Sequence, residues 1–148
     1  MSTIKSFRGL IPDGGTQKIS LSTRDGSIGY RIVKLNVITE NPGDTAYEHV
    51  LKIFKVEPSG SPTSAINFGD NTLIATAFTK GDELTYRSAG TTDIVFDNEV
   101  FNQDIFITQV DTKGSLSCNY YIELEPMKLD LNENTMVTLK DIRNTNSQ

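Results

Sequence analysis

The sequence predicts an all-β protein: a single-domain antiparallel β-sandwich of about eight or nine strands, arranged like a jelly roll. Two observations predict this class. Apolar and polar residues alternate with a period of two in most apolar stretches, which is typical of strands with one buried face. Turn motifs rich in Gly, Pro, Asn and Asp separate these stretches at roughly regular intervals. Because a 3.6-residue periodicity is almost absent, a sandwich or barrel is favoured over a mixed fold.

Eight stretches are predicted to be strands, and a segment near the start is a ninth candidate. In chain order they span residues 17–22, 28–39, 48–57, 72–79, 92–96, 104–110, 115–125 and 135–142, with 3–11 as the ninth. Within 28–39 the apolar positions change parity after Ile32, which indicates a β-bulge or a strand buried on both faces. The stretch 48–57 is apolar on both parities, so a short helix competes there. Its β-branched and aromatic residues favour a strand.

The chain is predicted to form one domain. A chain of 148 residues can enclose a single core that buries roughly 70% of the surface its unfolded form exposes. The segments 1–10 and 143–148 are expected to act as arms toward neighbouring subunits, since a terminal strand can pair with an exposed sheet edge.

Composition argues against several classes of partner. The net charge is −5, and the 14 Lys and Arg residues are scattered, so no basic patch is present that would neutralise several phosphates. We therefore expect no nucleic-acid partner and no anionic membrane partner. No apolar run is long enough for a membrane span or a signal-peptide core. We expect the chain to be synthesised in the cytoplasm of its host.

Candidate catalytic residues are few. His49 is the sole histidine, so any Ser-His-Asp or Cys-His arrangement would need it. Its place at the start of a predicted strand indicates a surface or strand-edge residue. Cys118 shares the parity of Tyr120 and Ile122, which predicts a buried, inert thiol. With a single cysteine, no disulfide within the chain and no cysteine-based metal centre can form. We expect no catalytic residue and no cofactor.

The stretch FDNEVFNQD, residues 96–104, gathers more carboxylate and amide oxygens than any other segment. A calcium site that also uses a second loop would take ligands from Asp97, Asn98, Glu99 and Asp104. An EF-hand is not indicated, because the stretch lacks the mid-loop glycine and contains Val100 and Phe101. The favoured interpretation is a structural corner whose polar side chains bond to the backbone of the connection.

Glu123 and Glu125 lie on one face of the predicted strand 115–125, as a carboxylate pair for glycoside hydrolysis could. The apolar residues of that strand have the opposite parity, so both glutamates are predicted to face solvent. Sugar-binding sandwiches usually present exposed aromatic side chains. This chain has no Trp, five Tyr and seven Phe, which weakens a carbohydrate-binding role without removing it.

Three motifs lie in the C-terminal third: FDNEVFNQDI at 96–105, CNYYIELE at 118–125 and TLKDIRNT at 138–145. In this pattern the chain resembles small virion structural proteins of tailed phages of marine bacteria, and the earlier segments IKSFRG and RIVKL fit the pattern more loosely. The resemblance implies a non-enzymatic part of a virus particle: a capsid decoration, minor capsid or tail-associated protein. It assigns no catalytic residues.

The sequence therefore leads to two hypotheses about function. The first is a virion structural protein that binds major capsid or tail subunits and copies of itself, as a capsid decoration (cement) or minor capsid protein. The alternative is a carbohydrate-binding or host-adhesion module on a β-sandwich. Aromatic and apolar residues that a monomer has no reason to expose, and arginines near the two ends, are the interface candidates. These are Phe7, Arg8, Tyr47, Phe101, Met127, Met136 and Arg143. Each aromatic or methionine candidate competes with a place in the core.

Overall fold

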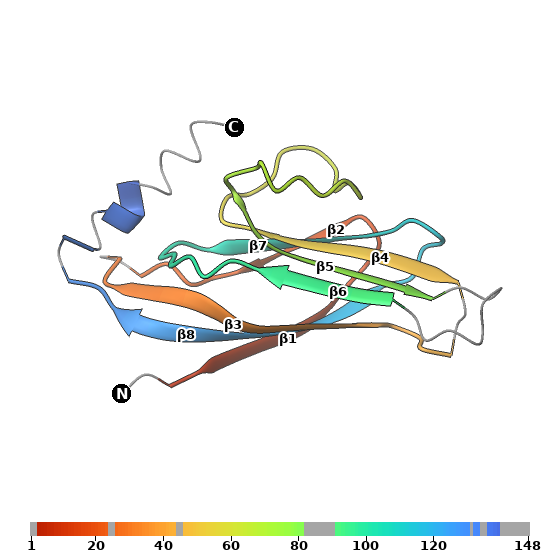
Figure 1. Ribbon diagram of the computed structural model, residues 1–148, viewed down its shortest axis with the longest axis horizontal. Coiled ribbons are helices and arrows are strands. Elements are labelled where there is room, and N and C mark those ends of the chain that lie inside the picture. The colour runs from red at the N-terminus through yellow and green to blue at the C-terminus, as the bar shows by residue number, and fades with distance from the viewer. Residues whose placement is uncertain are drawn as a thin grey trace.

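In a computed structural model, two antiparallel sheets pack face to face as a β-sandwich (Figure 1). The structure describes residues 3–23, 26–43, 46–81, 91–130, 132–133 and 136–139. The prediction of an all-β sandwich is confirmed. The finer expectation of a jelly roll stays a prediction.

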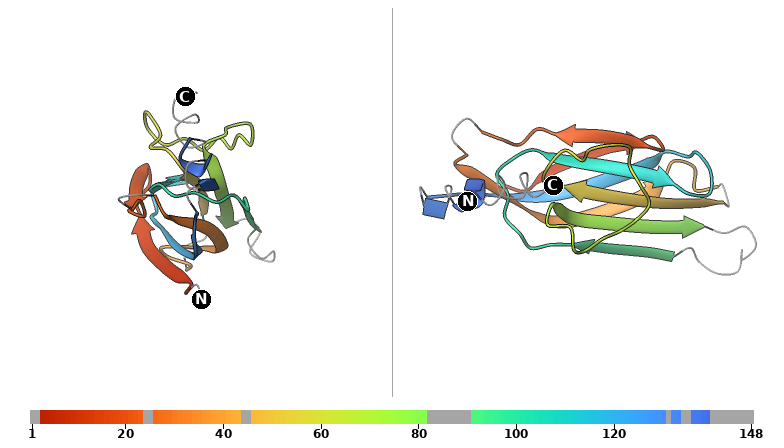
Figure 2. Two further views of the ribbon diagram at one scale, coloured as in Figure 1. Left: turned by 90° about the vertical axis from the view of Figure 1, so that its left-hand side faces the viewer. Right: turned by 90° about the horizontal axis from the view of Figure 1, so that it is seen from above.

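Eight strands make up the two sheets within the described residues. They are β1 (Lys5–Ile11), β2 (Gly15–Ile19), β3 (Ile28–Thr39), β4 (Tyr47–Phe54), β5 (Leu73–Gly81), β6 (Thr91–Phe96), β7 (Ile105–Asp111) and β8 (Cys118–Lys128). One sheet has three strands in the order β1-β8-β3, and the other has five in the order β2-β7-β4-β5-β6 (Figure 2). Each predicted strand between residues 17 and 125 overlaps an observed one, and the ninth candidate is β1.

β8 lies in the middle of the three-stranded sheet and shows the predicted alternation. Its side chains at Cys118, Tyr120, Ile122 and Leu124 are buried between the sheets. The intervening side chains, among them Glu123 and Glu125, lie on the outer face and are only partly buried. The prediction that both glutamates face away from the core is confirmed.

β3 carries the predicted bulge. Its register against β8 shifts between Ile32 and Lys34, so Val33 is the extra residue. Before the bulge Tyr30 and Ile32 face the core, and after it the odd-numbered positions starting with Leu35 do. The bulge lets one long strand keep its apolar side chains inward on both sides of a change in parity.

Phe101 lies at the centre of one end of the core, with 1% of its surface exposed. It exchanges two backbone hydrogen bonds with Tyr30, at 2.7 and 2.9 Å, and the two rings stack with their centroids 6.5 Å apart. The expectation that Phe101 contributes to an interface is therefore wrong. The segment 97–104 crosses to the edge of β3, and this crossing carries the ring inward.

The predicted strand 135–142 is wrong where the structure describes it, because residues 132–133 and 136–139 are helical. Asp130 and Glu133 form a capping box at the helix start. The Glu133 N–H donates to Asp130 Oδ1 at 2.8 Å, and the Asp130 N–H donates to Glu133 Oε1 at 3.3 Å. This D-x-x-E pattern was present in the sequence and outweighs the β-like composition of the segment.

Of the two segments expected to act as arms, the structure describes most of the first and none of the second. Residues 5–10 belong to β1 and pair with β8 of the same chain. The segment 143–148, including Arg143, lies outside the described residues.

Replacing Phe101 with Ala should lower the free energy of unfolding by about 3–5 kcal/mol, because a large cavity would remain in the core. Phe68→Ala is the matched control, since Phe68 is exposed, and it should change stability by no more than about 0.5 kcal/mol. Urea unfolding followed by circular dichroism measures both. Similar losses for the two variants would contradict the placement of Phe101.

Candidate functional site

The acidic stretch 96–104 divides between two places: Asp97, Asn98 and Glu99 line one surface pocket, and Asp104 lies outside it. Asp104 Oδ1 accepts hydrogen bonds from the backbone N–H groups of Leu21 and Ser22, both at 2.8 Å, and Lys18 Nζ lies 3.9 Å from Oδ2. Burial alone would raise the pKa of Asp104, but the hydrogen bonds from Ser22 and Leu21 outweigh it and, with Lys18, lower the pKa. Asp104 therefore fastens this corner to the segment after β2.

The other calcium candidates are engaged elsewhere. Glu99 pairs with Lys55 Nζ at 2.7 Å, and the Lys55 side chain is almost fully buried. Asn98 Oδ1 accepts a hydrogen bond from Arg31 at 3.1 Å. Within the described residues, no group of three or more His, Cys, Asp or Glu side chains is placed to hold a metal ion. The structure thus places Asp97, Asn98 and Glu99 at one pocket and does not bring Asp104 to them.

The expected structural corner is observed, with a different set of backbone partners. Asn102 is fully buried, and its Nδ2 donates to the Gly26 carbonyl at 3.1 Å and to Thr138 Oγ1 at 2.9 Å. Asn102 therefore bonds to the backbone of Gly26, and Asp104 to the backbone of Leu21 and Ser22. The corner links these residues and, through Thr138, the helical segment 136–139.

His49 is fully buried, so the prediction of a surface or strand-edge residue is wrong. Its Nδ1 lies 2.9 Å from Gln109 Oε1 and its Nε2 lies 2.8 Å from Thr39 Oγ1. Gln109 Nε2 donates to the Ile11 carbonyl at 3.0 Å, which leaves Oε1 as an acceptor. With this orientation of the Gln109 amide, His49 Nδ1 donates to Gln109 Oε1, and Thr39 Oγ1 is the partner of Nε2. Both ring nitrogens have structural partners.

Cys118 lies near this histidine, within the same end of the core. It is fully buried, and burial together with the nearby Asp111 carboxylate raises the pKa of its thiol to about 12. The prediction of a buried thiol is confirmed, and the raised pKa supports the predicted low reactivity.

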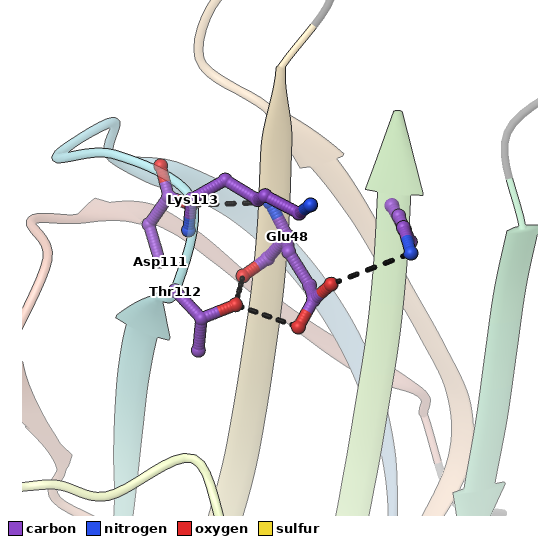
Figure 3. Close-up of polar contacts among 5 residues, drawn as sticks. Glu48, Asp111, Thr112 and Lys113 are labelled. Atoms are coloured by element: carbon purple, nitrogen blue, oxygen red, sulfur yellow. Dashed lines mark hydrogen bonds and ion pairs between the residues drawn. The ribbon is translucent and has the colours of Figure 1, made fainter. Parts of the chain in front are cut away.

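Asp111 organises the connection between β7 and β8 (Figure 3). Its carboxylate accepts hydrogen bonds from the backbone N–H groups of Glu48 (3.1 Å), Lys113 (3.1 Å) and Leu116 (2.9 Å). Thr112 Oγ1 donates to Glu48 Oε1 at 2.6 Å, which adds a second link to β4. The carboxylate is occupied by backbone donors and holds the β7–β8 turn against β4.

The outer face of the three-stranded sheet presents the best candidate for binding. A surface groove of about 510 Å³ lies on this face. We call it the outer-face groove, and it is lined by Arg8, Gly9, Leu10, Asn36, Ile38, Asn119, Tyr120 and Tyr121. Leu10 is 42% exposed and Ile38 is 59% exposed. Two exposed aliphatic side chains in one groove distinguish this face from an ordinary solvated sheet surface.

Strand register creates the groove. Arg8, Tyr121 and Asn36 are directly opposite one another across β1, β8 and β3, and so form one row. A second row consists of Leu10, Asn119 and Ile38. The rows are two residues apart on each strand, so all six side chains are on one face. The groove therefore combines an aliphatic pair with one aromatic, one cationic and two amide side chains.

Tyr121 is held in a fixed position within the first row. Its hydroxyl donates to Glu123 Oε2 at 2.6 Å, and Lys34 Nζ lies 5.8 Å from the ring centroid. The hydrogen bond to Glu123 is the main reason why the pKa of Tyr121 is raised. The ring is therefore anchored from the neighbouring row rather than free to rotate.

The remaining interface candidates lie apart from one another. Arg8 alone lines the outer-face groove. Phe7 faces inward and packs on the core, and the Tyr47 ring stacks on His49 with a centroid separation of 5.4 Å. Met127 is half-buried near the end of β8, and Met136 is exposed on the C-terminal helix. Leu10, Asn36, Ile38, Asn119 and Tyr121 were not predicted; their only sequence signal is that they occupy outward parity.

No family model matches the chain, and no curated protein has a similar sequence. Across the part of the chain that the structure describes, no helix has the length and apolar character needed to cross a membrane.

Asp111→Asn should lower the free energy of unfolding by about 1–3 kcal/mol at neutral pH, because hydrogen bonds to a charged acceptor would be weakened. Burial tends to raise the pKa of Asp111, but the backbone N–H groups of Glu48, Leu116 and Lys113, with the nearby imidazole, lower it. The folded pKa is thus below the unfolded value of about 3.9. This stability is present above that value and is lost as pH falls toward the folded pKa.

Urea titrations between neutral and acidic pH test this assignment. The Asp111→Asn variant should lose less stability than the wild type as pH falls below about 4. Asp97→Asn is the control, because Asp97 is an exposed carboxylate, and its acid dependence should match the wild type. An unchanged acid dependence in Asp111→Asn would contradict the role of this carboxylate.

Proposed function

We propose that the protein is a non-enzymatic virion structural protein that binds other particle subunits through the outer-face groove. The observation that carries the proposal is the exposure of Leu10 and Ile38 within this groove. Each would contribute on the order of 1 kcal/mol if a partner buried its exposed surface. A partner that covers both would gain this energy without any change of the sandwich itself.

The chemistry of the groove indicates what such a partner offers. Arg8 lies beside the aliphatic pair and can make bidentate hydrogen bonds to a carboxylate. Asn119 lies between Leu10 and Ile38 in its row, and Asn119 and Asn36 offer both donors and acceptors. Apolar side chains next to hydrogen-bonding groups are common in protein-binding surfaces. We therefore propose a partner surface with an aliphatic or aromatic patch next to an acidic side chain.

The buried polar residues are consistent with a structural role. His49, Asp111 and Cys118 are the groups that hydrolytic or nucleophilic chemistry would use, and each is committed to hydrogen bonds or to the core. Together with the resemblance to phage virion proteins, this favours a capsid decoration (cement) or minor capsid protein that is located in the virion. Its partners would be major capsid or tail subunits and further copies of itself.

Binding to particles that lack the protein tests the proposal. Purified wild-type chain should bind such particles with saturation at a fixed stoichiometry, measured by co-sedimentation. Ile38→Asp should weaken binding by about tenfold or more, because a carboxylate would be buried in an apolar contact. Phe68→Asp, which changes an exposed aromatic residue in the β4–β5 loop, should bind like the wild type. A wild-type chain that binds no particle component would contradict the proposal.

A carbohydrate-binding module is the second candidate, and the row Arg8–Tyr121–Asn36 favours it. An anchored tyrosine ring beside amide and guanidinium groups provides the apolar platform and hydrogen-bond partners that a sugar ring needs. The groove volume of about 510 Å³ lies within the usual range of small-ligand sites.

A glycan array, with and without calcium, separates the two candidates. If sugar binding occurs, Tyr121→Ala should abolish it through loss of the platform, whereas Tyr121→Phe should retain most of it. The Phe variant controls for the bond to Glu123. A wild-type chain with no signal on the array removes the carbohydrate candidate.

A further inference from the structure

Four strand edges border the two sheets, and three of them carry contacts or residues that hinder pairing with another strand. At the β1 edge, Gln17 Nε2 donates to the Leu10 carbonyl at 2.8 Å. At the β3 edge, Phe101 exchanges both backbone hydrogen bonds with Tyr30. The β2 edge is only five residues long and carries Lys18. Short strands and lysine are common means by which proteins prevent edge-to-edge pairing.

Within the described residues, the β6 edge carries less protection. Its sequence, TTDIVF, has one charged residue, Asp93, and no Lys, Arg or Pro, and its register against β5 shows no irregularity. Val95 is 48% exposed and Phe96 is 38% exposed. Figure 2 shows β6 at the rim of the five-stranded sheet. A regular, apolar and uncharged end of an edge strand is a template for another strand.

The register identifies the backbone groups that this edge presents. The Asp97 N–H donates to the Ile74 carbonyl at 2.9 Å, in the same register as the β5–β6 ladder. Because hydrogen-bonded pairs alternate along an antiparallel ladder, the backbone groups of Thr92, Ile94 and Phe96 point away from β5. Within the described residues, no backbone or side-chain partner bonds to these groups.

We propose that β6 pairs antiparallel with β6 of a second copy about a two-fold axis at Ile94, which joins two five-stranded sheets into one. Thr92 of each copy then lies opposite Phe96 of the other, and Ile94 lies opposite itself. The three outward-facing residues of each strand supply about six backbone hydrogen bonds. A two-fold axis keeps each row of side chains on the same face of the joined sheet and closes the assembly at two copies.

Charge selects this register over its neighbour. An axis at Asp93 would place two carboxylates directly opposite each other, which is unfavourable. An axis at Ile94 places each Asp93 opposite Val95 of the other copy. In this register each Asp93 carboxylate lies next to an uncharged Val95 side chain, and no two carboxylates are directly opposite each other.

This pairing does not depend on the proposed function, because the outer-face groove lies on the other sheet. Loss of particle binding with an intact dimer would contradict only the groove. A monomeric chain that still binds particles would contradict only the pairing.

A matched pair of substitutions at Val95 tests the register in the full chain. Val95→Glu places a carboxylate opposite Asp93 of the second copy and should weaken dimerisation by about tenfold or more. Val95→Lys makes the opposite pair and should retain or tighten the dimer at low salt. Analytical ultracentrifugation over a range of concentrations measures the dissociation constant of the wild type and of both variants.

A charge reversal provides the second measurement. The double variant Asp93→Lys with Val95→Glu restores opposite charges across the axis and should recover dimerisation relative to Val95→Glu alone. Circular dichroism confirms that each variant is folded. A wild-type chain that is monomeric at every concentration would overturn the proposal. Equal weakening by Glu and Lys at position 95, or no recovery in the double variant, would also overturn it.

Discussion

The paired backbone hydrogen bonds between Tyr30 and Phe101 hold the two sheets in register at one end of the sandwich. The connection from β6 to β7 leaves the five-stranded sheet, runs to the edge of β3 and returns, and this pair fixes its midpoint. With Phe101 anchored there, Glu99 lies against the buried Lys55 and Asp104 against the backbone after β2. A stretch whose acidic composition suggests ligand binding is therefore used to attach three distant segments to one another.

At the other end of β3, hydrogen bonds between buried side chains, rather than a backbone pair, connect the two sheets. Thr39, His49 and Gln109 form a buried chain of hydrogen bonds, and Asp111 accepts backbone donors next to it. Each of these contacts replaces hydrogen bonds to water that folding removes, so the cluster specifies the arrangement of β3, β4 and β7 more than it adds net stability. The outer face of the three-stranded sheet and the β6 edge remain available for contacts with other molecules, whereas on the five-stranded sheet Lys52 of β4 bonds to Thr63 and Ala65 of the β4–β5 loop.

Local sequence patterns were enough to predict most of the fold. The candidate site depends mainly on contacts between distant segments, which such patterns do not predict. Alternation predicted the strands, the bulge in β3 and the inward face of β8, since each depends on neighbours two residues away. The capping box of Asp130 and Glu133 was equally local, and the composition of the next residues obscured it. His49 and Gln109 are 60 positions apart, and nothing near either residue indicates that they meet. The rows of the outer-face groove also require the register between β1, β8 and β3, which periodicity alone does not supply.

The buried thiol of Cys118 has a practical consequence for locating this chain within an assembly. It is the single cysteine of the sequence, and its raised pKa and burial keep it protonated and shielded from thiol-reactive dyes at neutral pH. A cysteine introduced on an exposed loop would thus be labelled selectively, without removal of the native residue. Fluorophores or gold clusters attached in this way would report the orientation of each copy relative to its neighbours.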